Sequence, residues 1–166
     1  SGPGIRIPAT VAGLHVAGVQ DGAWPDANVP FGALRLWDNG TAWSQIETAK
    51  GRYNWALLDR AVANAEKQGM KNILLVLGST PSWNASEIVP GDYPVPGAAS
   101  PPKSIAAWDA FVTAVASRYK GRIKAYQVWN EASLAMFWSG TPEKMAELTR
   151  RAYDIIKAED PKATVV

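Results

Sequence analysis

The stretch Ala125-Tyr126-Gln127-Val128-Trp129-Asn130-Glu131 predicts a β-strand, because aromatic and β-branched residues such as Tyr126, Val128 and Trp129 are typical of strands. The strand ends abruptly in an amide and a carboxylic acid. Parallel sheets bind their ligands at the carboxyl ends of their strands, so this ending predicts a functional site there.

Other apolar runs predict further strands of the same sheet. We expect strands at residues 11–16, 31–37, 72–77 and 123–129, with residues 163–166 opening a fifth. The run at 72–77 is continuously hydrophobic, as a strand covered on both faces must be. No amphipathic helix is predicted between the first two strands.

Three amphipathic helices alternate with the later strands. They are predicted to run from Asn54 to a stop at Gly69, from the N-cap Ser104 to Gly121, and from Thr141-Pro142 to Asp160. Apolar residues recur along each at helical spacing, and Trp108 in the second is assigned to core packing. The order of elements predicts an α/β fold with right-handed crossovers, of the parallel (β/α) barrel type. A complete barrel needs about 250 residues, so we expect residues 1–166 to form a single half-barrel domain with strands one to four and the start of strand five.

Composition excludes several classes of function. The 17 basic and 15 acidic residues are scattered along the chain, so we expect no nucleic acid and no membrane as partners. The chain has no cysteine and one histidine, so we expect no metal and no cofactor. Its 47% hydrophobic content predicts a folded, soluble domain. The start at Ser1 lacks a signal-peptide pattern and is interpreted as a mature or trimmed N-terminus of a secreted or extracellular protein.

Tryptophan is unusually frequent. Eight tryptophans in 166 residues exceed what a small core needs, so some of them are expected to face a ligand. Sugar rings stack their C–H faces on indoles, which makes carbohydrate the ligand class that fits.

The motif around the fourth strand resembles a known group of enzymes. Trp129-Asn130-Glu131, followed by Leu134, Phe137-Trp138 and Gly140-Thr141-Pro142, is similar to the retaining glycoside hydrolases of clan A, and most of all to family 39 with its β-xylosidases. The resemblance covers only the front half of that family's catalytic domain. Ala132-Ser133 depart from the Pro-Asn that the family usually has at this point.

The resemblance implies roles for three residues. Glu131 would be the catalytic acid/base, and Asn130 would bind the sugar 2-hydroxyl. Arg35, inside the apolar run at 31–37, would lie beneath the nucleophilic carboxylate and keep it ionised. The alternative for Arg35 is a structural ion pair, because a cation in an apolar strand needs an anion.

Further substrate-binding candidates come from the loops. Trp37 and Asp38 follow the second strand, Trp83 lies in a Pro-x-Trp loop after the third, and Trp138 is expected at the rim. His15, at the end of the first strand, is either a sugar contact or a hydrogen-bonded core residue. The Pro-rich connection at 84–103 is too long for a passive turn and is expected to shape the site.

Retaining hydrolysis needs a second carboxylate, about 5–5.5 Å from the first. In the clan this nucleophile follows strand seven, and no other acidic residue here lies in a matching motif. The sequence therefore predicts a carbohydrate substrate. Either the chain is a piece of a longer glycosidase, or it is a half-barrel that pairs with a second copy in a homodimer or with a companion C-terminal half-barrel. Two alternatives stay open: a carbohydrate-binding module without turnover, and a structural, self-assembling half-barrel.

Overall fold

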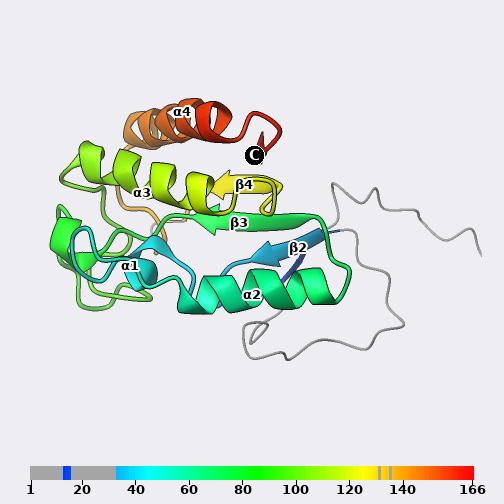
Figure 1. The fold of residues 1–166 in the computed structure, drawn as a ribbon. Helices are drawn as coiled ribbons and strands as arrows, with labels where there is room; N and C mark the ends of the chain where they lie inside the picture. Colours follow the sequence, from blue (N-terminus) through cyan, green and yellow to red (C-terminus); the bar gives the residue numbers. More distant parts are fainter. Residues whose placement is uncertain (1–12, 16–32, 131, 135) are drawn as a thin grey trace, which may run out of the picture.

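The computed structural model describes residues 13–15, 33–130, 132–134 and 136–166. Strands and helices alternate along most of the chain (Figure 1). In chain order the elements are β1 (Gly13–His15), β2 (Ala33–Leu36), α1 (Trp43–Ile46), α2 (Ala56–Lys67), β3 (Ile73–Leu77), the 3₁₀ helix η2 (Ser82–Asn84), α3 (Ile105–Arg118), β4 (Ala125–Val128), α4 (Pro142–Glu159) and β5 (Thr164–Val165).

The five strands form one parallel sheet in sequence order, β1-β2-β3-β4-β5. Parallel neighbours joined by right-handed crossovers place their helices on one face of the sheet, and α2, α3 and α4 follow one another along the sheet in Figure 1. The predicted α/β class and the order of strands and main helices are confirmed. The carboxyl ends of all strands lie at one edge.

The core lies between the sheet and these helices. Alternate strand residues such as Leu34, Leu36, Leu75 and Leu77 are fully or almost fully buried. Their intervening neighbours Arg35 and Leu74 are only half-buried, because they point to the opposite face. The helices contribute the apolar stripes that their periodicity predicts: Leu58, Ala61, Val62, Ala65, Ala107, Trp108, Phe111, Val112, Val115, Leu148, Ala152 and Ile156.

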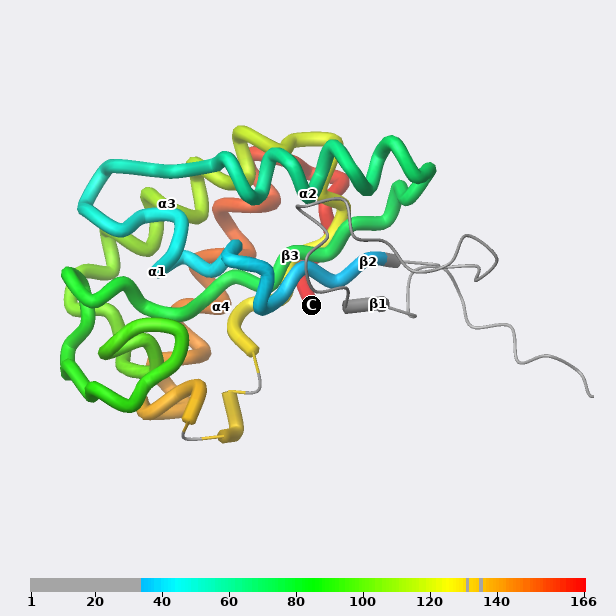
Figure 2. Tube along the Cα trace, turned by 90° about the horizontal axis from the view of Figure 1, so that it is seen from below, coloured from blue at the N-terminus to red at the C-terminus, as the bar shows by residue number. Residues whose placement is uncertain are grey.

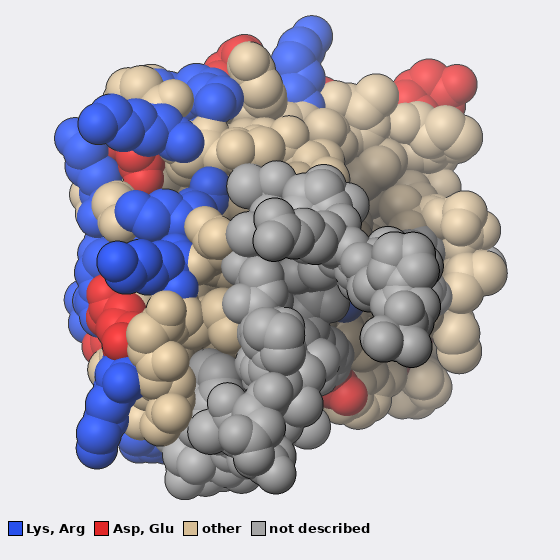
Figure 3. All heavy atoms as spheres, turned by 90° about the vertical axis from the view of Figure 1, so that its right-hand side faces the viewer, with Lys and Arg blue, Asp and Glu red and all other residues tan. Residues whose placement is uncertain are grey.

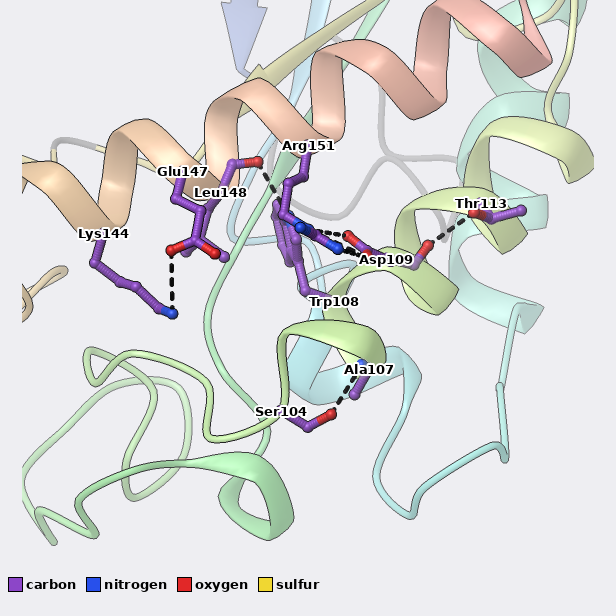
Figure 4. Close-up of polar contacts among 9 residues, drawn as sticks. All are labelled: Ser104, Ala107, Trp108, Asp109, Thr113, Lys144, Glu147, Leu148 and Arg151. Carbon is purple, nitrogen blue, oxygen red and sulfur yellow. Dashed lines mark hydrogen bonds and ion pairs between the residues drawn. The ribbon is translucent and has the colours of Figure 1, made fainter.

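Polar contacts cap α3 and join it to α4 (Figure 4). The Ser104 hydroxyl accepts a hydrogen bond from the Ala107 amide at 3.2 Å, which confirms the predicted N-cap. The indole N–H of Trp108 donates to the Leu148 carbonyl at 3.1 Å, and the ring is fully buried, so its assignment to packing is also confirmed.

The short helix α1 is not among the three helices that the sequence predicts. The amide of Trp43 donates to the Gly78 carbonyl at 3.0 Å, and the amide of Ser44 donates to the Ser79 carbonyl at 3.0 Å. The first amides of a helix have no partner within the helix, and two of those in α1 thus donate to carbonyls of the segment that follows β3. Because these bonds are long-range and the helix has only four residues, hydrophobic periodicity could not predict it.

Basic residues gather at the amino-terminal end of the sheet, which faces the viewer in Figure 3. Although lysine and arginine are scattered along the sequence, the alternation of strands and helices brings the helix carboxyl ends together there. Cations are favourable at that end of the helix dipole. Two arginines pair with α2 carboxylates, Arg118 with Asp59 and Arg122 with Glu66, both at 2.6 Å. The exposed members of this set are Lys67, Lys71, Arg118, Lys120, Arg122, Lys124 and Lys162.

We expect the face of the sheet that carries no helices to be an assembly interface. Its described residues include Leu74 and Ala125, which are neighbours in register and are both only half-buried, and apolar surface left in water costs about 25 cal/mol per Å². We expect the 166-residue chain to self-associate at micromolar concentrations in sedimentation velocity runs, and Leu74→Glu to weaken that association. Tyr153→Glu, at an exposed position on α4, is the matched control. A folded wild-type monomer throughout that range would contradict the prediction.

Candidate active site

The carboxyl ends of β2, β3 and β4 surround a pocket. Side chains that follow each of these strands line it, together with residues of the β3–α3 connection and the β4–α4 connection. The lining residues most relevant to function are Trp37, Asp38, Tyr93, Trp129, Asn130 and Phe137. The pocket is therefore at the edge where the sequence places the site.

The backbone around this pocket is unusual. Positive φ angles occur directly beyond three neighbouring strands, at Asp38 (59°), Ser79 (68°) and Trp129 (66°), as well as at Gly78 (141°). Asp38, Ser79 and Trp129 are the non-glycine residues with positive φ in the described part of the chain. Residues held in such conformations cluster at functional sites, since the surrounding structure must impose them.

Arg35 and Asn130 are brought into direct contact. The guanidinium Nη2 of Arg35 donates to Asn130 Oδ1 at 2.7 Å, and its Nε donates to Gln127 Oε1 at 3.3 Å. Gln127 in turn donates from Nε2 to the Trp129 carbonyl at 3.0 Å. The network joins the end of β2 to the end of β4, across β3.

This network fixes the amide of Asn130. A guanidinium can only donate hydrogen bonds, so the amide oxygen must face Arg35 and the NH₂ group is the donor left for another partner. Asn130 is 8% exposed. A buried amide that is held in one orientation offers its NH₂ group in one direction only, so it binds an acceptor selectively. The sequence resemblance implies that Arg35 holds a carboxylate. Among the described residues, Arg35 contacts two side-chain amides and the ring of Trp37, whose centroid is 6.0 Å from the guanidinium carbon.

Trp129 belongs to the pocket and to the core at once. Its ring packs against Trp108 and Trp138, with centroids 6.1 and 5.0 Å apart, and its indole N–H donates to the Phe137 carbonyl at 2.6 Å. Phe137 then contacts Trp37 edge to face at 5.8 Å. Trp37 and Phe137 thus present aromatic surface to the pocket from two different loops.

Not every predicted site residue lines the pocket. The indole of Trp83 is directed away, donating to the Glu47 carbonyl at 2.8 Å and packing on Trp43. Trp138, expected at the rim, is 5% exposed in the core cluster, with its N–H on the Thr141 carbonyl. Glu131 and the side chain of His15 lie outside the described residues, so their predicted roles stay predictions.

Tyr93 and Gln127 line or support the site, but sequence reasoning missed both. Gln127 was a polar residue inside an otherwise apolar strand, at three positions before Asn130, and that position was a usable signal. Tyr93 comes from the long connection at 84–103, and its hydroxyl donates to Asp38 Oδ1. This hydrogen bond raises the pKa of Tyr93, with smaller contributions from burial and from the Asp38 charge.

Two other features are absent from the described ranges. No group of three or more histidine, aspartate and glutamate side chains there is arranged to hold a metal ion. None of the described helices has both the length and the apolar composition needed to cross a membrane.

Comparison with protein families gives one match. The sequence model described as glycosyl hydrolase family 10 matches residues 31–145, from before β2 into α4. That range contains every pocket residue discussed above. A comparison with curated proteins gave no match.

Solved structures of glycoside hydrolases share the fold. A family 39 glycoside hydrolase from Bacteroides cellulosilyticus WH2 aligns with 96% of this chain at 22% identity and a TM-score of 0.65. A monomeric β-xylosidase from Caulobacter crescentus CB15 aligns with 93% at 23% identity and a TM-score of 0.64. A psychrophilic family 10 endo-β-1,4-xylanase aligns with 92% at 16% identity and a TM-score of 0.58.

The chain spans about a third of the first two of these structures, 31% and 34% of their lengths, and 50% of the third. The predicted clan A relationship and the half-barrel fold are therefore confirmed. Within the clan, the family model that matches is family 10, while the structures of similar fold include members of family 39 and family 10.

Proposed function

The chain belongs to glycosyl hydrolase family 10, and from this membership we propose that it carries the acid/base half of a retaining glycoside hydrolase site. In this proposal Glu131 protonates the leaving oxygen and later activates water. Asn130 donates from its amide to the sugar 2-hydroxyl, a contact that strengthens in the transition state.

The contact between Arg35 and Asn130 is the observation that carries this proposal. It supports a rigid amide donor at the end of β4, and Glu131 is the next residue in the chain. An acid/base needs the sugar held within hydrogen-bonding reach, which a preoriented neighbour provides. The aromatic surfaces of Trp37 and Phe137 supply the stacking that a sugar ring requires.

The proposed substrates are β-linked, xylose-containing saccharides. This rests on the xylanase and β-xylosidase named among the structures of similar fold. We infer that the nucleophilic carboxylate comes from a further barrel segment, either the rest of a longer chain or a companion half-barrel, because those structures are two to three times as long as the chain.

Sugar titration tests the binding half of the proposal. We expect xylobiose to change the tryptophan fluorescence of the chain saturably, because Trp37 and Trp129 line the pocket. Asn130→Ala should weaken binding by about 5- to 10-fold, the value of one hydrogen bond of about 1 kcal/mol. Gln68→Ala, at the exposed end of α2, should bind like wild type. Equal affinity for both variants would rule out Asn130 as a sugar ligand.

A carbohydrate-binding role without turnover is the second candidate. Among the described residues that line the pocket, Asp38 is the one carboxylate, and it already accepts the Tyr93 hydroxyl. Saturable binding with no released product, in every assembly that the chain forms, would favour this alternative.

A further inference from the structure

Helix α1 brings a further polar side chain to the pocket. This helix lies beyond the carboxyl ends of β2 and β3 (Figure 1, Figure 2). Gln45, its third residue, is half-buried and lines the pocket together with Thr41 and Ala42. Gln45 is neither one of the residues that the sequence predicts for the site nor part of the network of Arg35 and Asn130. Its role therefore has to be inferred from its own contacts.

The backbone of the same helix fixes the amide of Gln45. The Ala42 N–H donates to Gln45 Oε1 at 3.2 Å, and the Gln45 N–H donates to the Ala42 carbonyl at 2.9 Å. A backbone N–H can only donate a hydrogen bond, so the side-chain atom that faces Ala42 is the amide oxygen. The NH₂ group is the donor left for another partner, and no described residue accepts a hydrogen bond from it.

Contacts on both sides hold α1 in place at the pocket. The amide of Ser44 donates to the Ser79 carbonyl at 3.0 Å, and the hydroxyls of these two serines are hydrogen-bonded at 2.7 Å. The side chain of Trp43 is fully buried, and its indole N–H donates to Glu47 Oε1 at 2.7 Å. Because Ser79 itself lines the pocket, these contacts keep Gln45 at the wall of the same pocket.

Gln45 and Asn130 present the same chemistry to the pocket. In each side chain a protein donor occupies the amide oxygen, the Ala42 N–H for Gln45 and the Arg35 guanidinium for Asn130. Each therefore offers an NH₂ group. Gln45 belongs to the β2–α2 connection and Asn130 follows β4, so the two donors come from different parts of the chain. A ligand that satisfies both must carry two acceptor oxygens, which a sugar does.

We propose that Gln45 is a specificity-determining residue, whose NH₂ group donates a hydrogen bond to a sugar hydroxyl other than the 2-hydroxyl that Asn130 binds. This inference rests on the proposed function for the class of ligand. A site built to hydrogen-bond a hydroxyl rejects an analogue that lacks it, because a polar group of the site is then left unpaired. Gln45 thereby selects sugars that carry an oxygen at one further ring position.

Sugars that each lack one hydroxyl test the inference. Xylobiose and its monodeoxy analogues are titrated by calorimetry into wild type and into Gln45→Met, which keeps the length of the side chain and removes its polar atoms. We expect Gln45→Met to bind xylobiose about 5- to 10-fold more weakly, the value of one hydrogen bond. One analogue, and not the one that lacks the 2-hydroxyl bound by Asn130, should bind wild type and Gln45→Met equally, because it lacks the partner of the Gln45 amide. Gln68→Met, at the exposed end of α2, should match wild type for every sugar.

Gln45→Glu separates the donor from the helix cap. Its side-chain oxygen still accepts the Ala42 amide, and an acidic residue is favourable in the first turn of a helix, so urea melts should match wild type. The carboxylate cannot donate a hydrogen bond, and neither can fluorine, which is a weak acceptor. At the hydroxyl that the deoxy series identifies, we expect replacement by fluorine to cost Gln45→Glu at least 5-fold more affinity than it costs wild type.

The possible failures are distinguishable. If Gln45→Met weakened the binding of every sugar by the same factor, Gln45 would act only through the fold, and the inference would be overturned. If the equal binding fell on the analogue without the 2-hydroxyl, Gln45 would share the partner of Asn130, which also overturns it. In both cases a loss of affinity in Asn130→Ala would leave the proposed function standing. Failure of wild type to bind any of these sugars overturns the proposed function and the inference together.

Discussion

Replacing Glu131 with glutamine is expected to lower the hydrolysis of an alkyl β-xyloside, whose leaving group needs protonation, by about 100- to 10,000-fold, the usual contribution of a general acid/base. The assay uses the chain in the assembly that supplies the second carboxylate. Glutamine preserves the size of the side chain and can still form hydrogen bonds, but it cannot donate or accept the transferred proton. Binding of xylobiose should stay within a few-fold of wild type.

The leaving group identifies the role of Glu131 more sharply than the rate alone. A 2,4-dinitrophenyl group departs without protonation, so kcat/KM for its xyloside should fall far less than kcat/KM for the alkyl xyloside. A merely structural residue would lower both equally. Glu87→Gln, at an exposed loop position, is the matched control. Equal losses for the two substrates, or a large loss in urea stability, would reject the acid/base role.

The fold was predictable where local sequence and tertiary structure agree. The continuous apolar run at 72–77 became β3, and the helical stripes with their caps at Ser104 and Thr141 became α3 and α4. Helix α1 was not predictable, because the bonds from its first amides go to Gly78 and Ser79, far away in the sequence. Its stability belongs to the tertiary structure.

The site was predictable to the extent that it depends on strand ends. Trp37, Asp38 and Asn130 were predicted at the carboxyl edge of a parallel sheet, and the family resemblance pointed to Arg35 and Asn130. The structure brings these residues around one pocket or into contact with it. The direction of a tryptophan ring was not predictable in this way, because it depends on turn geometry and not on where a strand ends. Trp83 and Trp138 follow turns whose backbone angles the sequence does not specify, and their rings face the protein interior.

The second large effect is expected at Gly78, whose conformation determines where Trp129 lies. Its φ is 141°, which residues with side chains rarely adopt. A Cβ there would lie 2.8 and 2.9 Å from two ring carbons of Trp129 and 3.1 Å from its Cα. Trp129 is 2% exposed and packed on two other tryptophans, so it has no space to move.

We expect Gly78→Ala to lower the free energy of unfolding by about 2–6 kcal/mol, since backbone strain and overpacking each cost about 1–3 kcal/mol. Gly51→Ala is the matched control: its φ is 76°, also positive, but a Cβ there meets nothing within 4 Å. It should cost about 1–2 kcal/mol, the penalty of the left-handed region alone. Urea melts of the two variants, followed by circular dichroism, measure the difference. If both lost the same stability, the contact between Gly78 and Trp129 would contribute nothing. If Gly78→Ala folded stably and kept xylobiose affinity, Trp129 would not need its present position for the pocket to bind sugar.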